Sequence, residues 1–373
     1  MGTDVQSIVI GAGVIGLAIG RELASKGQEV LVLERHGGIG TEVSSHDSEV
    51  IHAGLYYPPG SLRARLCVAG KEMLYDFARE NGVAHRRTGK LLVATDDQDL
   101  ARLRAIAETA AKNGVGDLVA LTGAEARALE PELACVAAYL SPSTGVIDSH
   151  GLMQALEGHI SGAGGNVVLN AEVTGVSRDA AGNFEIATQS GGVASSLASR
   201  NLVIAAGLGS SRLGRMLGGA GQYRVPETYS AKGHYFALSG KAPFRHLVYP
   251  MPQGAWLGIH VTLDIAGQAK FGPDIAWTDT VDYAFEDEDG ARKRLFEREV
   301  RRYWPSLPEG SLEPGYTGVR PKIYREGEAV ADFAIHGVAD HGVERLVALY
   351  GIESPGLTSS RAIAAQVGAM LAP

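Results

Sequence analysis

Residues 7–16 of the chain are SIVIGAGVIG, followed by LAIGRELAS at 17–25 and EVLVLE at 29–34. The run 7–10 is rich in β-branched residues and has no alternating polar face, which is typical of a parallel strand covered on both sides. The next stretch predicts a helix that ends at Lys26-Gly27. Residues 29–33 predict a second buried strand, so the chain opens with a strand–turn–helix–strand unit.

Three glycines occupy the turn of this unit. Gly11 permits the tight turn, Gly13 lets the backbone approach a pyrophosphate, and Gly16 lets the helix pack against the strand. The pyrophosphate would sit at the helix N-terminus, where amide groups are unpaired and the dipole is positive. Glu34, 18 residues after Gly16, ends the second strand, where a carboxylate accepts hydrogen bonds from the adenosine ribose. The pattern predicts an adenine-dinucleotide site; a chance glycine cluster in an ordinary turn is the alternative.

The segment after Glu34 favours FAD over NAD. Residues 37–46 are GGIGTEVSSH, a loop whose Gly, Ser and Thr residues suit phosphate and ribityl contacts. A nicotinamide-binding domain would continue its alternation of strands and helices here. An NAD enzyme remains the alternative from these residues alone.

The chain resembles the D-amino-acid oxidase-like superfamily of FAD-dependent oxidoreductases, and most closely its L-2-hydroxyglutarate dehydrogenases and oxidases. The resemblance extends over nearly the whole chain. It rests on the segments SHDSEVIHAGLYY (45–57), SLRARLCV (61–68), GKLLVA (89–94), SPSTGVID (141–148), YPMP (249–252), LGIHVT (257–262) and GVR (318–320).

Three stretches depart from that family pattern. Asp47 and Glu49 stand where the family has Asn and Gly. The segment AKGHY (231–235) stands where the family has Arg-Gly and a following Tyr, and residues 265–309 are shortened and divergent. These differences indicate that the substrate pocket is altered.

Composition narrows the class of protein further. The chain has 373 residues and a net charge of −8, which disfavours nucleic-acid binding. Cys67 and Cys135 form no metal or redox motif, so no metal site is predicted. No apolar run is long enough to span a membrane. We expect a cytoplasmic protein, with peripheral association at the inner membrane as the alternative.

The resemblance implies an α/β fold, α+β overall, in which a Rossmann-like FAD-binding domain carries an inserted antiparallel-sheet substrate domain. It places residues 1–85, 147–222 and 332–373 in the FAD-binding domain. Residues 86–146 and 223–331 would form the substrate-binding domain, with the substrate between the two.

Local patterns predict further elements. Helices are expected at 62–81, 98–113 and 151–162, parallel strands at 166–169 and 202–205, and a strand of a flanking sheet at 184–188. Residues 345–350 predict a last strand, and the turn GIESPGLTSS (351–360) leads into a final helix.

The resemblance places further FAD contacts after the fingerprint. It implies that amide groups at the start of the final helix face the flavin pyrimidine ring and stabilise negative charge on reduced flavin. The resemblance also implies that residues 201–209 form a second cofactor-contacting strand and its glycine turn. The alternatives are an ordinary strand and turn at 201–209 and a routine helix cap by Thr358 or Ser359. The predicted cofactor-binding residues are Gly11, Gly13, Val14, Ile15, Gly16, Glu34, Arg35, Thr41, Ser44, Ser45, His46, Val173, Ala206, Gly207, Leu208, Gly351, Ile352, Glu353, Pro355, Gly356, Leu357 and Thr358.

Five residues are candidates for the reacting centre. Oxidation of a hydroxy acid releases a hydroxyl proton, for which histidine is the usual acceptor near neutral pH. His52 and His260 are the candidate bases, with hydrogen-bonded structural histidines as the alternative. Arg320 matches the position where the superfamily often binds a substrate carboxylate. Lys232 is a candidate ligand for a second carboxylate, with Tyr235 donating its hydroxyl.

The predicted function is therefore FAD-dependent oxidation of a small carboxylate substrate, such as L-2-hydroxyglutarate, to the 2-oxo acid by hydride transfer to flavin N5. One alternative is an amino-acid or secondary-amine oxidase of the same superfamily. Another is a non-catalytic FAD-binding subunit. The electron acceptor, whether oxygen, a quinone or an electron-transfer protein, is not encoded in a readable motif.

Overall fold

The computed structural model describes residues 3–217, 223–251 and 258–372. It divides into two compact units, each described by itself below. The first contains residues 1–45, 149–230 and 320–373, and the second contains residues 46–148 and 231–319. Each unit is therefore assembled from separate pieces of the chain.

The first unit is built on an eight-stranded sheet among the described residues. Its centre is parallel, in the order β9-β2-β1-β12-β20, with Ile8 of β1 opposite Leu31 of β2 and Leu202 of β12. Strand β12 is long, and its first half pairs antiparallel with β11 before the second half joins the parallel sheet. The strands are β1 (Val5–Ile10), β2 (Val30–Leu33), β9 (Asn166–Val168), β10 (Glu172–Arg178), β11 (Phe184–Ser190), β12 (Val193–Ile204), β19 (Ala334–His336) and β20 (Leu346–Tyr350).

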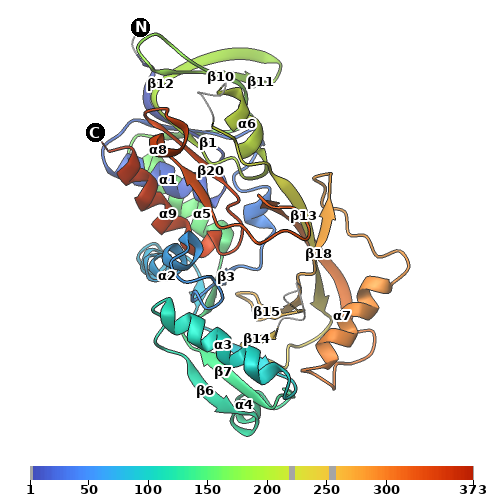
Figure 1. The fold of residues 1–373 in the computed structure, drawn as a ribbon. Helices are drawn as coiled ribbons and strands as arrows, with labels where there is room; N and C mark the ends of the chain where they lie inside the picture. Colours follow the sequence, from blue (N-terminus) through green and yellow to red (C-terminus); the bar gives the residue numbers. More distant parts are fainter. Residues whose placement is uncertain (1–2, 218–222, 252–257, 373) are drawn as a thin grey trace. The chain divides into compact units, whose positions relative to one another are not determined.

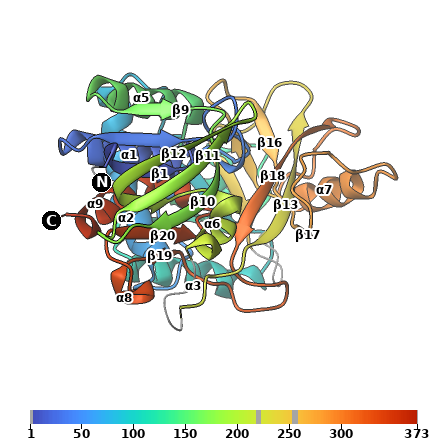
Figure 2. The same cartoon turned by 90° about the horizontal axis from the view of Figure 1, so that it is seen from above.

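Helices cover the parallel strands of this unit. Helix α1 packs against both α5 and α9 (Figure 1). Strands β10, β11 and β12 form an antiparallel layer (Figure 2). The helices are α1 (Val14–Ser25), α5 (Ser149–Gly162), α6 (Ser210–Met216), α8 (Val338–His341) and α9 (Gly356–Met370), with 3₁₀ turns at Val43–Ser45 and Gly207–Gly209.

The second unit is built on a mixed, mainly antiparallel sheet. Its described strands run in the order β17-β13-β16-β15-β14-β5-β7-β6, and β18 pairs with β13; β3, β8 and β4 form a small separate sheet. Strands β5 and β14 are parallel neighbours. The strands are β3 (Val50–Ile51), β4 (His85–Arg86), β5 (Lys90–Ala94), β6 (Val119–Thr122), β7 (Ala137–Ser141), β8 (Gly145–Ile147), β13 (Tyr229–Leu238), β14 (Leu247–Pro250), β15 (Val261–Leu263), β16 (Ala269–Phe271), β17 (Ala276–Thr278) and β18 (Leu312–Lys322).

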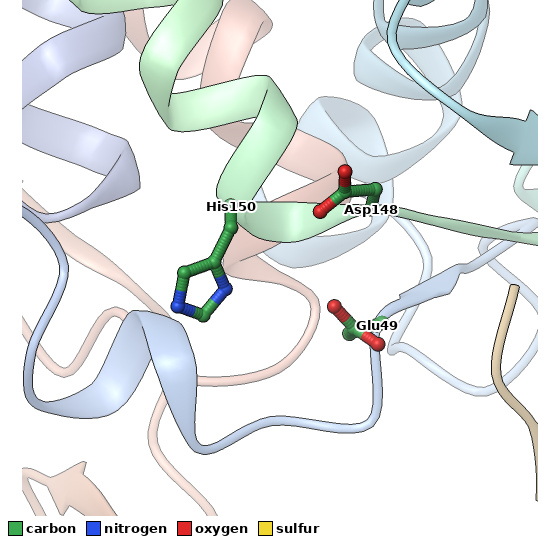
Figure 3. A group of neighbouring side chains, drawn as sticks. All are labelled: Glu49, Asp148 and His150. Atoms are coloured by element: carbon green, nitrogen blue, oxygen red, sulfur yellow. The ribbon is translucent and has the colours of Figure 1, made fainter.

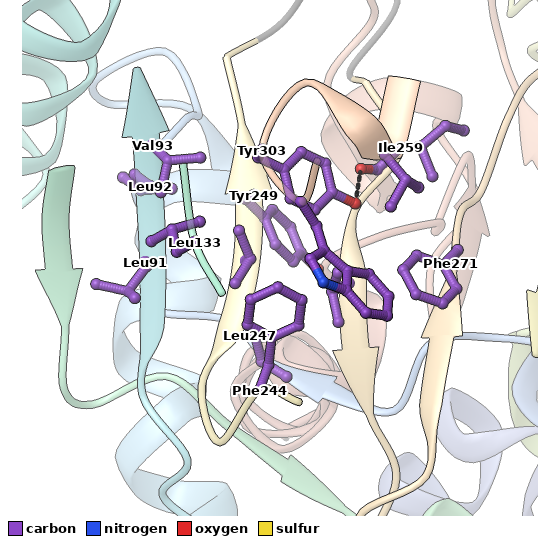
Figure 4. Close-up of a cluster of buried hydrophobic side chains, with 14 of the residues drawn as sticks. Leu91, Leu92, Val93, Leu133, Phe244, Leu247, Tyr249, Ile259, Phe271 and Tyr303 are labelled. Atoms are coloured by element: carbon purple, nitrogen blue, oxygen red, sulfur yellow. Dashed lines mark hydrogen bonds between the residues drawn. The ribbon is translucent and has the colours of Figure 1, made fainter. Parts of the chain in front are cut away.

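One hydrophobic core fills this second sheet and its helices, α2 (Leu62–Glu80), α3 (Asp99–Lys112), α4 (Gly123–Leu129) and α7 (Ala291–Arg301). Figure 4 shows Leu91, Leu92 and Val93 of β5 near Tyr249 of β14 and Tyr303. Tyr303 is fully buried, and its hydroxyl donates to the carbonyl oxygen of Ile259 at 2.9 Å. The core thereby fixes the segment that leads into His260.

The predicted elements agree with the observed ones in type. The helices expected at 62–81, 98–113 and 151–162 are α2, α3 and α5, and the strands expected at 166–169 and 202–205 are parallel strands β9 and β12. The strand expected at 184–188 is β11 of the antiparallel layer. The mixed α/β architecture is the one predicted.

The boundaries of the two units differ from the expected domain boundaries. Residues 46–85 belong to the second unit, because Lys71 and Tyr75 of α2 both bond Ser143, at 2.9 and 3.1 Å. Residues 320–331 belong to the first unit, in which Lys322 pairs with Glu353. The expected domain ends at 1, 222 and 373 lie outside the described residues.

Candidate active site

The glycine turn between β1 and α1 is too crowded for side chains. Gly11 has φ +106°, and a Cβ there would lie 2.6 Å from the carbonyl oxygen of Ala205. A Cβ on Gly16 would lie 1.9 Å from the carbonyl oxygen of Gly11. Helix α1 has Gly13 at its N-cap with no side-chain cap, and the Val14 amide donates to Ser44 Oγ at 3.0 Å. The start of α1 therefore presents amide groups and a hydroxyl, the donor set that suits a pyrophosphate.

Glu34 directly follows β2, and its side chain is held in a fixed orientation. Its carboxylate accepts from the backbone amides of Ala12, at 2.9 Å, and His36, at 2.9 Å, and the residue is 8% exposed. A carboxylate held in this way keeps further lone pairs for hydroxyl donors. The neighbouring Arg35 is exposed and forms an ion pair with Glu42.

The predicted loop residues 41–46 fall in both units. Thr41 is exposed, Ser45 donates its hydroxyl to the Gly40 carbonyl oxygen, and Ser44 lies at the start of α1 as described. His46 begins the second unit and stacks on Tyr283 with ring centroids 4.1 Å apart. The loop is ordered by its own hydrogen bonds around the glycine turn.

A second uncapped helix start lies in the first unit. Helix α9 begins at Gly356 after the N-cap Pro355 and has no side-chain cap. Thr358 and Ser359 are buried inside its first turn, so the alternative of a routine cap by either residue is not what the structure has. Gly351, with φ +66°, directly follows β20 and starts the turn that leads to α9.

The other predicted cofactor residues lie in different settings. Ala206, Gly207 and Leu208 are half-buried in the 3₁₀ turn that follows β12. Val173 of β10 is 3% exposed and belongs to the core of the first unit. The Glu353 carboxylate forms a buried ion pair with Lys322, at 2.9 Å, so this side chain is already engaged. Ile15, Ile352 and Leu357 are half-buried.

The two candidate bases both belong to the second unit, and they are close enough for the charge of His260 to affect His52. His260 is 8% exposed and stacks on Tyr249, with ring centroids 3.6 Å apart and planes 9° from parallel. Burial holds the pKa of His52 well below its ordinary value of 6.5, and the charges of Lys90 and His260 lower the pKa further. A neutral imidazole is the form that accepts a proton.

Lys232 is engaged by carboxylates of its own chain. It is 3% exposed, and its ammonium donates to Asp282 at 2.5 Å and to Glu286 at 2.7 Å. Although burial lowers the pKa of Lys232, these hydrogen bonds raise it above its ordinary value. His234, next but one along β13, joins the same network through Asp274 and Glu286. This pairing is at odds with the expectation that Lys232 binds a substrate carboxylate.

Tyr235 comes three residues after Lys232 on β13, and an odd separation along a strand places two side chains on opposite faces. Its ring stacks on Tyr316 with centroids 4.5 Å apart. The Tyr316 hydroxyl donates to the Asp47 carbonyl oxygen at 2.5 Å. The strand period thus separates the Tyr235 ring from the Lys232 ammonium, and their joint action on a substrate stays a prediction.

Arg320 is half-buried near the end of β18 and counts with the first unit. The period of two in a strand places it on the same face of β18 as Lys322. Lys322 bonds Glu353, in the turn before α9. Arg320 therefore lies two residues before Lys322 on β18, and the ion pair of Lys322 with Glu353 holds the turn that precedes α9.

Comparisons with known proteins identify the family. The model of the family described as "DAO: FAD dependent oxidoreductase" matches residues 6–370. The chain belongs to this family. It is 41% identical over 97% of its length to "L-2-hydroxyglutarate dehydrogenase, mitochondrial" of Arabidopsis thaliana, covering 82% of that protein. The L-2-hydroxyglutarate dehydrogenase of Salmonella houtenae is 29% identical over 96% of the chain and 91% of its own length.

A solved structure has the same fold as this FAD-dependent oxidoreductase. The L-alpha-glycerophosphate oxidase of Mycoplasma pneumoniae, with FAD bound, superposes with a TM-score of 0.87 at 23% identity. The match covers 100% of the chain and 95% of that structure. The prediction of a flavoprotein of the D-amino-acid oxidase-like class, with FAD as its cofactor, is confirmed by the family match.

The donor set of the first unit fits FAD by its own geometry. The glycine turn has no room for side chains, and the helices α1 and α9 both begin without a side-chain cap. After β2, backbone amides hold the carboxylate of Glu34. No helix among the described residues is long and apolar enough to cross a membrane.

Figure 3 shows Glu49 and Asp148 with His150 in the first turn of α5. Within the second unit, the Ile147 amide donates to the Glu49 carbonyl oxygen at 3.0 Å, which brings the Glu49 and Asp148 segments together. His150 belongs to the first unit. Acidic groups of this kind are common without an ion, so we assign no metal to the oxidoreductase here.

Sequence reasoning missed the surroundings of the histidines. Tyr249 and Lys90 both lie in segments that carry the family resemblance, but neither is among the residues that the sequence predicts to be functional. A signal was present for Lys90, because a lysine directly before the apolar run LLVA (91–94) must be buried if the run forms a central strand. No comparable signal marks Tyr249.

Proposed function

We propose that this oxidoreductase oxidises L-2-hydroxyglutarate to 2-oxoglutarate. The observation that supports this most strongly is the high identity, over nearly the whole chain, to a plant protein named for that substrate. When bound, FAD supplies a two-electron acceptor for the hydride that leaves C2 of the substrate.

The first unit is the proposed FAD-binding part and the second the proposed substrate-binding part. The amide groups at the start of α1, together with Ser44, would hold the pyrophosphate. Glu34 would accept hydrogen bonds from the ribose. The uncapped start of α9 would hold the flavin ring by its amides and positive dipole end.

His52 is the proposed general base. As the C2–H bond breaks with its electron pair, the hydroxyl proton moves to the His52 ring and the C–O bond becomes a carbonyl. The lowered pKa of His52 supports this role, because the ring is neutral before each turnover. His260, held by its stack on Tyr249, would hydrogen-bond the same oxygen and orient it.

Arg320 is the proposed ligand of the C1 carboxylate, since a guanidinium offers two parallel donors to one carboxylate. We give Lys232 a structural role in place of the one expected from the sequence, because two carboxylates already hold its ammonium. The Tyr235 ring, stacked on Tyr316, would pack beside the bound substrate.

Anaerobic titration of the purified yellow holoenzyme tests the proposal. L-2-hydroxyglutarate should bleach the flavin absorbance stoichiometrically and release 2-oxoglutarate. The D-enantiomer, L-glutamate and sarcosine should leave the flavin oxidised. Bleaching by an amino acid or secondary amine, with none by the hydroxy acid, would make the chain an amine oxidase instead.

The electron acceptor and the location belong to the same proposal. We place the enzyme in the cytoplasm, with association at the inner-membrane surface if a quinone is the acceptor. Turnover rates with oxygen, a soluble quinone and an electron-transfer protein distinguish the acceptors. Co-sedimentation with anionic vesicles tests the peripheral association.

A further inference from the structure

Lys90, the first residue of β5, is a buried amine in an unusual setting. The residue is 0% exposed, and its Nζ has no hydrogen-bond partner among the residues that the structure describes. Two aromatic rings take the place of polar partners: Nζ lies 4.9 Å from the ring centroid of Tyr56 and 4.5 Å from that of Tyr249. Buried amines are ordinarily paired, so this arrangement is costly for the fold.

The Tyr249 ring separates Lys90 from His260. His260 stacks on one face of that ring at 3.6 Å, which leaves no room for an ammonium between the rings. Lys90 therefore approaches Tyr249 from the opposite face. On its other side, Lys90 is close to Cys67 of helix α2. The Cys67 thiol in turn donates to the His52 carbonyl oxygen at 3.5 Å, which brings the His52 segment near Lys90.

Among the described residues, the ionisable groups around Lys90 are Cys67 of α2, His52 and Tyr56 of the segment before it, and Tyr249 of β14. His260 acts on His52, and Lys71 acts on Cys67. Burial lowers the pKa of Lys90 to about 7, and burial raises the pKa of Cys67 to about 12, so the thiol is neutral. Within this set of facing groups no carboxylate compensates the charge of Lys90.

We propose that Lys90 is a positioning residue that keeps the His52 imidazole in its neutral, proton-accepting form. The inference rests on the proposed role of His52 as the base. Because Lys90 Nζ is sealed from solvent, it does not bind the substrate directly and acts through its field on His52. Two like charges in one apolar pocket disfavour each other, so an ammonium at Lys90 opposes protonation of His52.

A lysine that merely filled space would be replaceable by methionine without effect on a neighbouring titration. The Lys90→Met variant keeps the length and the apolar stem and removes the charge. Lys71→Met is the matched control: Lys71 is also a buried lysine near Cys67, but its amine donates to Ser143 Oγ at 2.9 Å. Flavin content and thermal unfolding establish that each variant is intact.

The first measurement is the titration of His52 by NMR, on holoenzyme labelled with ¹³C at the histidine rings. Comparison with a His52→Gln sample assigns the signal. We expect Lys90→Met to raise the pKa of His52 by about one unit. The acid limb of the kcat/KM profile should move to higher pH by the same amount. Lys71→Met should change neither.

A second measurement needs no substitution. In the unmodified holoenzyme, the His52 signal should show a small additional inflection near pH 7, where Lys90 loses its proton. An unchanged His52 titration in folded Lys90→Met, or the absence of that inflection, overturns the proposal. If the coupling is present but the holoenzyme does not oxidise 2-hydroxyglutarate, the electrostatic role of Lys90 stands and the proposed function fails.

Discussion

Tyr249 and His260 stack face to face, with ring centroids 3.6 Å apart and planes 9° from parallel. The stack uses the faces of the two rings, and the nitrogens of His260 lie in the ring plane. A residue on the neighbouring strand β14 therefore contributes to the orientation of this histidine. That makes Tyr249 a determinant of the site although it carries no proton in the proposed reaction.

Replacement of Tyr249 by leucine should lower kcat/KM for the substrate by about tenfold. An aromatic pair contributes about 0.5–1.5 kcal/mol beyond its buried area, and this orientation energy is lost with the ring. Steady-state kinetics of Tyr249→Leu and Tyr249→Phe provide the measurement. Tyr249→Phe keeps the stack and should remain within about twofold of the parent; equal losses in both variants would assign the effect to the hydroxyl.

Arg320→Met should raise KM for the hydroxy acid and lower kcat/KM about 10- to 100-fold. A hydrogen bond to a charged group contributes about 1.5–3 kcal/mol, and the variant loses the carboxylate contact. Arg320→Lys keeps the charge but not the two-point geometry, so it should recover only part of the loss. A substrate ester lacking the negative charge should bind both variants and the parent equally; a carboxylate ligand elsewhere would leave Arg320→Met unchanged.

Lys232→Met should lower the free energy of unfolding and leave KM within about twofold of the parent. Its ammonium bonds Asp282 and Glu286 across the second unit, so the loss is a structural one of about 1 kcal/mol. Denaturant unfolding of the holoenzyme and steady-state kinetics measure the two effects. A rise in KM comparable to that of Arg320→Met would restore Lys232 to substrate binding.

Gly11→Ala should prevent stable FAD binding. A methyl group there meets the Ala205 carbonyl at 2.6 Å, at a φ of +106°. Gly27→Ala is the matched control, since Gly27 also has a positive φ, +79°, but nothing within 4 Å of the added Cβ. The ratio of flavin to protein absorbance should fall only in Gly11→Ala. Equal loss in both variants would indicate general backbone strain in place of crowding at the turn.

Asp47→Asn should stabilise the protein, and more so at pH 8 than at pH 5. Burial raises the pKa of Asp47 from 3.8 to about 7. The folded state thus holds the Asp47 proton more tightly than the unfolded state does. The contribution of this proton to the free energy of unfolding is complete below about pH 4 and is lost as the pH rises through 7. We expect a gain of about 1–2 kcal/mol at pH 8 in denaturant unfolding. Asp97→Asn, on an exposed acid, should show no such pH-dependent gain.

The local patterns predicted the first unit well. Its parallel strands are continuous apolar runs in the sequence. The spacing of Gly11, Gly13 and Gly16 is typical of a dinucleotide-binding turn. The sequence also marked Glu49 as a departure from the family's glycine. Glu49 indeed adopts φ +57°, a conformation that glycine takes more readily. Local conformational preference is readable in such stretches because a few neighbouring residues determine it.

The second unit was less predictable because its contacts are distant in sequence. Lys232 and Glu286 are 54 residues apart, and no periodic pattern connects them. The same holds for Tyr249 and the Lys90 amine on β5. A lysine on a strand suggests a ligand or a surface group until its partners are known, and the sequence alone does not show that Asp282 and Glu286 hold the ammonium of Lys232.

The parallel sheet of the first unit has a consequence for synthesis. Strand β1 is made first, but its neighbour β12 emerges nearly two hundred residues later, and β20 and α9 come last. A nascent chain on the ribosome therefore carries an unfinished sheet with an exposed apolar edge for most of its translation. If the start of α9 holds the flavin as proposed, stable capture of FAD requires residues 346–370 to have left the exit tunnel.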